Sequence, residues 1–551
     1  MRFNKTIVCL AILACTPAGA ATIDNVAVPA GVASTKLADT VPMRIILSLK
    51  LRDPEGAAAF AAAVSDPRSP AYGHYMSATE FGLRFGPAAD TYEYLRSWAL
   101  MNGLSVGPRT PSRTTVSVAG NAGQFARLFS TSFSSFHTPT HGDGVSMLTV
   151  PQVPVELATR IEGVVGLSSA GHYFPLAHIL AGPRANVGTG VNGSGYAPSD
   201  IRTAYNIAGQ TTSKKTEVLA IFEQGGLRVS QLTKYETQYN LPKVKLTQKS
   251  VNGAPTGLSD SGVELEALLD VDAALGVNTA LKSVIVYEDG ADTFQVALLD
   301  SLQQVATDGI AKVLSISYGQ DEVMQGTSAV QAENTVLVQL ASQGITVFAS
   351  SGDQGAAGRT GTGLNAPDPG SQPYLTSVGG TALQTVSAGG AWQSEVVWDN
   401  SASSATGGGA SSIWSIPSWQ VVNGVSVAAK NHGSATKRNV PDVAAVAYPN
   451  TGYSVYDSTY GGFIAIGGTS LSAPLWAGIT TIINSDRVAA GLARVGFFNP
   501  KLYQLGVVGT GFHDVTSGHN GSPGFKAGRG YDNTTGFGSV DLGTFLPIVL
   551  Q

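Results

Sequence analysis

The chain has 551 residues, which exceeds the usual size of one domain and predicts at least two. Hydrophobic residues make up 43% of the chain and charged residues only 13%, so we expect a large core under a surface poor in charge. The formal net charge of −5 argues against nucleic acid or an anionic membrane surface as a partner.

Residues 1–20 have the pattern of a secretory signal peptide. A basic start precedes a short apolar run, and the segment ends on small residues up to Ala20. The apolar run is too short to span a bilayer permanently, so we expect no membrane contact after signal removal. Both cysteines, Cys9 and Cys15, lie in this segment, which predicts a mature chain without disulfides. We therefore expect a secreted protein, either extracellular or periplasmic.

Residues 21–180 are predicted to form a small α+β domain. Strand-like runs alternate with helical runs there, the strands at 43–51 and 114–120 and the helices at 55–66, 91–103 and 121–133. Glycine, proline, serine and asparagine then dominate residues 181–198, which predicts an exposed linker.

Residues 199–551 are predicted to form an α/β domain. Its apolar, β-branched runs lie at 217–222, 283–288, 312–317, 345–350 and 462–468, and helical stretches at 261–276, 293–309 and 329–344 lie between them. Such an alternation indicates a parallel sheet covered by helices on both faces. Ligands of such sheets bind beyond the carboxyl ends of the strands, so the loops after 345–350 and 462–468 are candidate site loops.

Ser470 is the first candidate for a catalytic residue. Residues 467–478 read GGTSLSAPLWAG, which resembles the nucleophile segment of a serine peptidase. A serine nucleophile needs a base, and the usual base is histidine. Only His432, His513 and His519 lie in the second block, and none stands in a Gly-Thr-His helix start. A histidine-dependent enzyme stays an alternative with little support.

Glu266 and Asp270 are the candidate replacement for a histidine base. They lie four residues apart in a helical stretch, so their side chains share one face among leucines and a valine. Two carboxyls held together with little water cannot both ionise easily, and such a pair can accept a serine proton in mildly acidic solution. The alternative is a solvated like-charge pair, which costs a helix only ~0.2–0.5 kcal/mol.

Asp353 is the third candidate. It follows the strand at 345–350 in the segment SSGDQG. A protonated aspartate there can donate a hydrogen bond to the carbonyl oxygen on which charge develops during acyl transfer. The alternative is an aspartate that only stabilises a tight turn.

Together these segments resemble the sedolisin, or serine-carboxyl peptidase, family over nearly the whole chain after the signal peptide. The family pattern is matched by Glu266-x-x-x-Asp270, Ser-Gly-Asp353-x-Gly and Gly-Thr-Ser470-x-Ser-x-Pro, in that order. The resemblance implies a subtilisin-like fold, with Ser470 as nucleophile, Glu266 as base, Asp270 orienting Glu266, and Asp353 as oxyanion donor. Glu223 and Tyr318 fall where some members extend the hydrogen-bond network, although relatives often have tryptophan at the second position.

The resemblance also implies a metal and an inhibitor. The segment 512–538 matches the family's calcium loop, and one Ca²⁺ would be held by five residues: Asp514, Val515, Gly528, Gly530 and Asp532. Residues 21–180 match the activation prodomain, which is expected to inhibit the enzyme until self-cleavage in or near 181–198. We further hypothesise that protonation of prodomain histidines and carboxylates weakens this inhibition.

The sequence therefore predicts a zymogen of an acid-active serine endopeptidase that acts on proteins or peptides and is a monomer. Three alternatives stay open: a tripeptidyl-peptidase of the same family, a histidine-dependent subtilisin-like protease, and a secreted binding protein without activity on the same scaffold.

Overall fold

The structure of the chain is a computed structural model. It describes residues 22–23, 32–138, 142–169, 174–175, 178–179, 188–209, 216–253, 261–290, 293–361, 363–400, 404–422 and 424–551. The predicted signal peptide and residues 181–187 of the predicted linker lie outside these residues. No helix in the described part of the chain is long and apolar enough to cross a bilayer.

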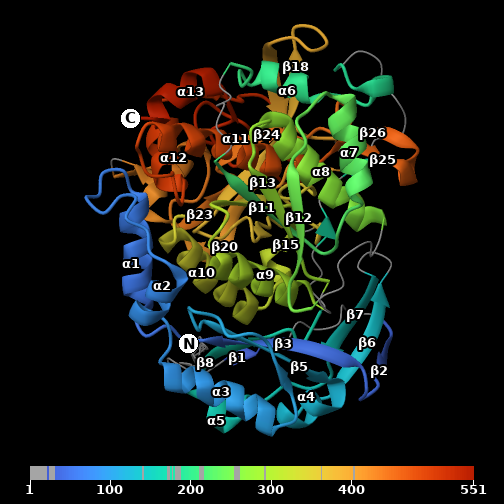
Figure 1. The fold of residues 1–551 in the computed structure, drawn as a ribbon, viewed down its shortest axis with the longest axis vertical. Coiled ribbons are helices and arrows are strands. Elements are labelled where there is room, and N and C mark those ends of the chain that lie inside the picture. Colours follow the sequence, from blue (N-terminus) through green and yellow to red (C-terminus); the bar gives the residue numbers. More distant parts are fainter. Residues whose placement is uncertain are drawn as a thin grey trace, which may run out of the picture.

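The N-terminal part is built on a five-stranded sheet (Figure 1). Its strand order is β1 (Thr22–Ile23), β8 (Ile161–Val165), β3 (Pro42–Leu49), β5 (Thr115–Asn121) and β4 (Ser105–Val106). Helices α3 (Ala89–Met101) and α4 (Ala122–Leu128) share a buried core with this sheet, to which Trp98 and Phe125 belong together with strand residues such as Ile45.

The predicted helix at 121–133 is wrong in its second half. Asn121 and Gln124 form a capping box that starts α4, as expected for these residue types. Ser130 has φ of 51°, a left-handed conformation that cannot continue a helix. The chain then enters β6 (Phe133–Thr138), which pairs with β2 (Ser34–Lys36) and β7 (Gly142–Met147).

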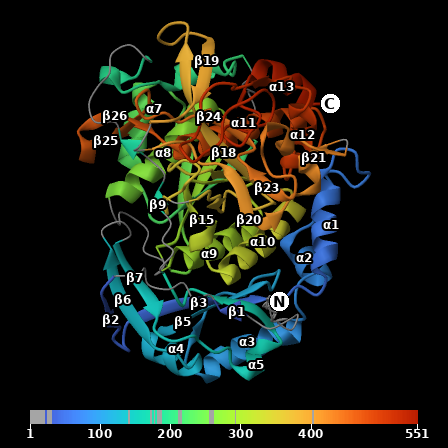
Figure 2. The same cartoon turned by 180° about the vertical axis from the view of Figure 1, so that it is seen from behind.

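The C-terminal part contains a large sheet, as predicted. Its strand order is β12 (Lys245–Ser250), β13 (Ser283–Glu288), β11 (Val218–Glu223), β14 (Val313–Ile316), β16 (Thr346–Ser350), β18 (Thr376–Thr385) and β19 (Trp392–Val397), with β24 (Val443–Val446) also paired to β18. The strands are parallel except for β19. Figure 2 shows β18, β19 and β24 together at the end of the sheet that the sequence left unassigned.

Helices cover both faces of this sheet, which confirms the predicted α/β class. Along β11, Leu219 and Ile221 belong to the core shared with α8 (Ser261–Val277) and α11 (Thr469–Ala489). The alternate residues Ala220 and Phe222 belong to the core shared with α9 (Phe294–Asp308) and α10 (Thr327–Ser342). A strand buried on both faces needs apolar residues at every position, which explains its continuous apolar run.

The predicted strand at 462–468 lies outside the large sheet. It forms β26 (Gly462–Gly467), antiparallel to β25 (Tyr453–Asp457). A short turn with Gly461 in a left-handed conformation, φ of 88°, connects the two strands. An apolar run predicts a strand but does not identify its partner, so the assignment to the parallel sheet was wrong.

The two parts pack against each other along an extended seam. Helix α1 (Pro54–Ser65) lies beside α10, and Ala57 and Ala61 share a small core with Val338 and Ala341. Farther along, Ile46 of β3 joins the core under α9. Polar contacts add to this seam, since Thr114 Oγ1 donates to Gln303 Oε1 at 2.7 Å.

Candidate active site

The ends of three neighbouring strands bring candidate residues to one edge of the sheet. Glu223 is the last residue of β11, Tyr318 follows β14, and Asp353 follows β16. The parallel register aligns Phe222 with Ile316, so carboxyl ends meet at the same edge. This register accounts for the predicted site loop after 345–350, whereas the predicted site loop after 462–468 follows β26, which lies outside the large sheet.

Glu266 and Asp270 are fully buried on α8, which packs against α11. Both Asp270 carboxylate oxygens lie 2.7 Å from the hydroxyl of Ser317, which donates to them. Neither side chain has any exposed surface, unlike a carboxylate pair on a solvated helix face. Burial without a cation partner is the kind of environment in which a carboxyl such as Asp270 retains its proton.

Electrostatics reinforce this proton retention. Burial raises the pKa of Asp270 well above its usual range, and the Ser317 hydroxyl offsets part of the rise. Burial also raises the pKa of Glu223, and the neighbouring Asp270 and Glu266 carboxyls raise it further. The hydroxyl of Tyr318 donates to Glu223 Oε2 at 2.8 Å. The site is therefore a buried carboxyl cluster linked by neutral donors.

Ser470 lies in the first turn of α11. Gly468 precedes the helix with φ of 115°, a conformation that favours glycine and lets β26 turn sharply into α11. The Ser470 hydroxyl donates to the backbone oxygen of Ser317 at 3.1 Å. Ser317 therefore contacts Ser470 through its backbone and Asp270 through its side chain.

Pro474 explains a second contact between the same residues. The helix begins at Thr469, so Pro474 lies inside it, beyond the first turn. Proline has no N–H, and the carbonyl of the residue four positions earlier loses its helical donor. That carbonyl belongs to Ser470, and Ser317 Oγ lies 3.4 Å from it, although the single hydroxyl proton of Ser317 is directed to the nearer Asp270.

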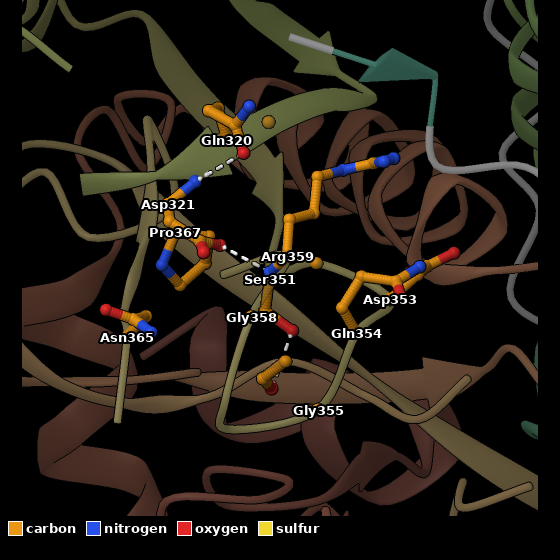
Figure 3. Close-up of a pocket in the computed structure, with 13 residues that line it drawn as sticks. Gln320, Asp321, Ser351, Asp353, Gln354, Gly355, Gly358, Arg359, Asn365 and Pro367 are labelled. Atoms are coloured by element: carbon orange, nitrogen blue, oxygen red, sulfur yellow. Dashed lines mark hydrogen bonds between the residues drawn. The ribbon is translucent and has the colours of Figure 1, made fainter. Parts of the chain in front are cut away.

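Asp353 is held against the start of the same helix. Its Oδ1 accepts hydrogen bonds from Thr469 N at 2.9 Å and from Thr469 Oγ1 at 2.6 Å. The side chain of Asp353 is 1% exposed, and its partner Thr469 is the residue directly before Ser470. It also borders a pocket that is lined by β15 (Tyr318–Asp321), by residues 351–359, and by Pro367 (Figure 3).

The structure thus gathers the four predicted catalytic residues from separate strands and helices, and adds two that the sequence did not single out. Ser317 and Thr469 position Asp270, Ser470 and Asp353. Ser317 directly precedes the candidate Tyr318 and follows β14, and Thr469 directly precedes Ser470 and starts α11. Their position next to candidate residues was the sequence signal that could have identified them. Together the groups can move a proton from a hydroxyl to a carboxyl and donate to a carbonyl oxygen.

The histidines of the second block contact other regions. His513 stacks on Trp392 with ring centroids 4.1 Å apart. His519 Nδ1 lies 2.8 Å from Asp399 Oδ2. His432 is exposed at the end of a short 3-10 helix and has φ of 62°. These contacts give no support to a histidine base for Ser470.

Two short segments before the linker pair with the edges of this site. β9 (Phe174–Pro175) runs antiparallel to β15, with Pro175 opposite Tyr318 (Figure 2). β10 (His178–Ile179) runs antiparallel to β26, with His178 opposite Gly467. The chain that leaves the N-terminal part therefore adds strands to both walls that flank the carboxyl cluster, as an extended peptide would.

The predicted calcium ligands lie together near the C-terminus. Gly530 N donates to Asp514 Oδ2 and Gly528 N donates to Asp532 Oδ2, each at 2.9 Å. Burial raises the pKa of both carboxyls. Among the described residues, no three His, Cys, Asp or Glu side chains are gathered as a metal site, so backbone carbonyls such as that of Val515 would have to complete an oxygen ligand set.

Comparisons with known proteins identify the family to which the chain is similar. Residues 31–170 match the sequence family described as Pro-kumamolisin, activation domain. The chain is 30% identical to xanthomonalisin of Xanthomonas sp. (strain T-22), over 93% of this chain and 66% of that protein. It is 30% identical to sedolisin of Pseudomonas sp. (strain 101), over 90% of this chain and 85% of that protein. A solved structure of Pseudomonas sedolisin, a serine-carboxyl proteinase complexed with two molecules of pseudo-iodotyrostatin, aligns with a TM-score of 0.58 and 29% identity, covering 66% of this chain and 99% of that chain.

Proposed function

Because the chain belongs to the sedolisin family and is a serine-carboxyl peptidase, we propose that it is a secreted, acid-active endopeptidase made as a self-processing zymogen. Ser470 is the nucleophile and Glu266 the general base. Asp270 orients Glu266, and Asp353 donates to the oxyanion. The observation that carries this proposal is the double contact of Ser317, 2.7 Å from Asp270 and 3.1 Å from the Ser470 hydroxyl.

In the proposed mechanism, the Ser470 hydroxyl turns from Ser317 O toward Glu266 when a substrate binds. Its oxygen attacks the carbonyl carbon of the peptide bond while its proton passes to Glu266. The oxygen that becomes negative accepts a hydrogen bond from protonated Asp353. Glu266 then gives its proton to the leaving amine as the C–N bond breaks. Water repeats these steps and releases the acyl group from Ser470.

The proposed acid dependence has a physical basis in the cluster. Asp353 can donate to an oxyanion only while it carries a proton. Asp270 and Glu223 have raised pKa values and hold protons in mildly acidic solution, so they add little negative charge beside Glu266. As the pH rises, Asp270 and Glu223 lose their protons, and their negative charges lie close together in a buried site. Each charge then makes ionisation of the neighbouring carboxyls less favourable.

The proposed inhibition rests on β9 and β10. These strands occupy the edges of β15 and β26, to which a peptide substrate would have to add. The N-terminal part thus blocks access to Ser470 while it stays attached. With this inhibition we propose the domain boundaries expected from the sequence: a signal peptide at 1–20, an inhibitory prodomain at 21–180, a cleavable linker at 181–198, and the peptidase domain at 199–551.

The C-terminal loop is proposed to hold one Ca²⁺. The chemistry of the donor set fits a hard cation, because the carboxyl of Asp532, which is buried, and that of Asp514, which is exposed, are both hydrogen-bonded to one glycine-rich loop. The carboxylates of Asp514 and Asp532 and the carbonyls of Val515, Gly528 and Gly530 would be the ligands. A bound cation would balance the negative charge of the two carboxylates and stabilise this loop.

The test is to acidify the purified precursor and its Ser470→Ala variant and to follow their masses. Wild type is expected to lose its N-terminal part by a cut within or near residues 181–198, and Ser470→Ala is expected to stay intact. Equal processing of both would contradict the assigned nucleophile. A quenched peptide with a blocked N-terminus then separates endopeptidase action from a tripeptidyl-peptidase, which requires a free N-terminus.

A further inference from the structure

A cut in the linker does not by itself uncover the active site. Both β9 and β10 lie before residues 181–198, so they stay on the prodomain when the linker is cut. They pair with β15 and β26, the two walls that flank Ser470. If these strands inhibit as proposed, the peptidase becomes active only when the prodomain dissociates. The contacts that hold the prodomain then decide when this happens.

The loop that follows α1 contacts the peptidase domain far from Ser470. We call residues 66–76 the docking loop, and Figures 1 and 2 both show it beside α12 (Asn499–Gly506). Gln504 of this helix donates through Nε2 to Asp66 Oδ1 at 3.1 Å. The loop also contacts the last turn of α11, a helix of 21 residues that has Ser470 in its first turn. At a rise of about 1.5 Å per residue, the two ends of this helix lie about 30 Å apart.

Tyr75 of the docking loop fills a space that two glycines of the peptidase domain leave open. Its hydroxyl donates to the backbone oxygen of Arg494 at 2.8 Å. A Cβ on Gly496 would lie 2.2 Å from that hydroxyl oxygen, and a Cβ on Gly344 would lie 2.3 Å from a carbon of the ring. Both distances are too short for any real contact, so a side chain at either position would displace Tyr75. We call the space between Gly344, Gly496 and the Arg494 carbonyl the tyrosine slot.

The docking loop also approaches the peptidase domain closely beside Tyr75. Gly73 has φ of 77°, a left-handed conformation, and a Cβ there would lie 2.5 Å from the Cβ of Ala493. Arg487 Nη2 of α11 donates to the Tyr72 hydroxyl at 3.2 Å. Tyr75 is therefore held in the slot by a loop that is itself bound to the peptidase domain.

We propose that the tyrosine slot keeps the prodomain bound to the peptidase after the linker is cut, so that release of Tyr75, rather than the cut, sets the time at which activity appears. This inference rests on the proposed self-processing and on inhibition by β9 and β10. An aromatic side chain packed into a pocket of its partner is the kind of anchor that carries much of the binding energy of an interface. Once empty, the slot is a surface of the mature enzyme that fits a tyrosine-bearing loop, and its partner is the free prodomain.

The test follows three quantities in the acidified precursor: the cut by mass, prodomain binding by size-exclusion chromatography, and activity on a quenched peptide. Cut wild-type chains should still elute with their prodomain, and activity should follow the cut after a delay. Tyr75→Ala should raise the dissociation rate of the prodomain about 100-fold and remove the delay, because losing an interface anchor costs a factor of this order. Tyr75→Phe keeps the ring and loses one hydrogen bond, so it should raise that rate about 5-fold.

A matched pair of variants changes the slot from the peptidase side and leaves the prodomain unaltered. Gly496→Ala places a methyl group in the slot and should release the prodomain about as fast as Tyr75→Ala. Gly491→Ala is the control, since its φ of 77° is also left-handed, like the 66° of Gly496, but a Cβ there meets nothing within 4 Å. Alanine is strained in both positions, and only one of them blocks Tyr75. Thermal melting shows which variants are folded, and if Tyr75→Ala is not, Tyr75→Phe and this pair decide.

The outcomes separate this inference from the assignment of the peptidase. A wild type that becomes active as soon as it is cut, or equal delays in Gly496→Ala and Gly491→Ala, would overturn the role of the slot and leave the peptidase assignment standing. A precursor that is never cut would overturn the proposed self-processing and the role of the slot with it.

Discussion

Helix α8 presents carboxyls to two different environments, and the comparison explains how one helix serves both stability and chemistry. Glu264, near its start, accepts hydrogen bonds from Arg228 Nε at 2.8 Å and Nη2 at 2.7 Å. Asp270, farther along, accepts from the neutral hydroxyl of Ser317 and lies near Glu223. Glu264 is 2% exposed and Asp270 is fully buried, so burial alone does not separate them. The charge of the partner does: a cation gives an ion pair, and neutral donors give a carboxyl that keeps its proton.

The largest effect on activity is expected from a substitution at Glu266, the proposed catalytic residue of α8. Glu266→Gln removes the proposed base and should lower kcat by about 10²- to 10⁴-fold, because positioned proton transfer contributes about that much. The matched variant Glu264→Gln breaks the ion pair with Arg228 and should lower the free energy of unfolding by about 1–3 kcal/mol. It should leave kcat within a few-fold. Steady-state kinetics and thermal melting of both variants separate the two roles, and equal losses of kcat would contradict them.

A smaller effect is expected at Ser317, which links Asp270 to Ser470. Ser317→Ala leaves a buried carboxyl without its hydroxyl donor, a loss of about 1–3 kcal/mol that should lower kcat by roughly 10- to 100-fold. Ser315→Ala is the control, since Ser315 lies two residues earlier on β14 and its hydroxyl makes no hydrogen bond among the described residues. A loss of kcat in Ser315→Ala of the same size would show that Ser317 acts only through packing.

The calcium loop extends the comparison to two further carboxyls, of which Asp532 is buried and Asp514 is exposed. If Asp514 and Asp532 are balanced by a bound cation, a chelator should lower Tm by several degrees, and added Ca²⁺ should restore it. Asp514→Asn should weaken this response, and kcat of the folded fraction should stay nearly unchanged. A Tm that is the same with chelator and with Ca²⁺ would contradict the proposed Ca²⁺ site.

The smallest effect concerns the seam between the two parts. Asp300 on α9 accepts a hydrogen bond from Ser117 of the prodomain at 3.1 Å, and burial raises its pKa to about 7, although Arg44 lowers it in part. A carboxyl with a raised pKa in the complex takes up a proton when the parts bind. Its contribution is therefore most favourable at acidic pH and is lost as the pH rises toward about 7.

Protonation of Asp300 thus stabilises the contact between prodomain and peptidase domain in acid, which is opposite to the hypothesis that protonation of prodomain groups weakens the inhibition. Dissociation of the prodomain at acidic pH would have to overcome this contribution. Asp300→Asn should raise the Tm of the precursor at pH 8 by a few degrees and change it little at pH 4. Melting of wild type and variant at both pH values gives the measurement. A variant that destabilises the precursor equally at both would show that Asp300 contributes only through its hydrogen bond.

The sequence predicted those features that one segment encodes by itself. Continuous apolar runs identified the strands β11, β13, β14 and β16, and the three short motifs identified Glu266, Asp270, Asp353 and Ser470 as candidates. Features that depend on a distant partner were missed. β26 pairs with β25 rather than with the large sheet, and Ser317 becomes important only because α8 and α11 bring Asp270 and Ser470 to it.

Tyr75 illustrates the same limit. Its neighbours in sequence, Gly-His before it and Met-Ser after it, form no periodic apolar pattern, and nothing local relates it to Gly344 or Gly496. Its position follows from the approach of the docking loop to the peptidase domain, which places its hydroxyl against Arg494, a contact across 419 residues. Glycine at 73 was the one local signal, since a left-handed turn is needed there.

The central claim is that a serine is activated by carboxyls rather than by imidazole, and the most direct test is the pH dependence of kcat/KM of the processed enzyme on a substrate that does not titrate. The account predicts a maximum in acid, a fall above about pH 6, and loss of activity at every pH in Glu266→Gln but not in His432→Ala, His513→Ala or His519→Ala. A rate that rises through about pH 7 and persists in alkali, or full activity in Glu266→Gln, would contradict it.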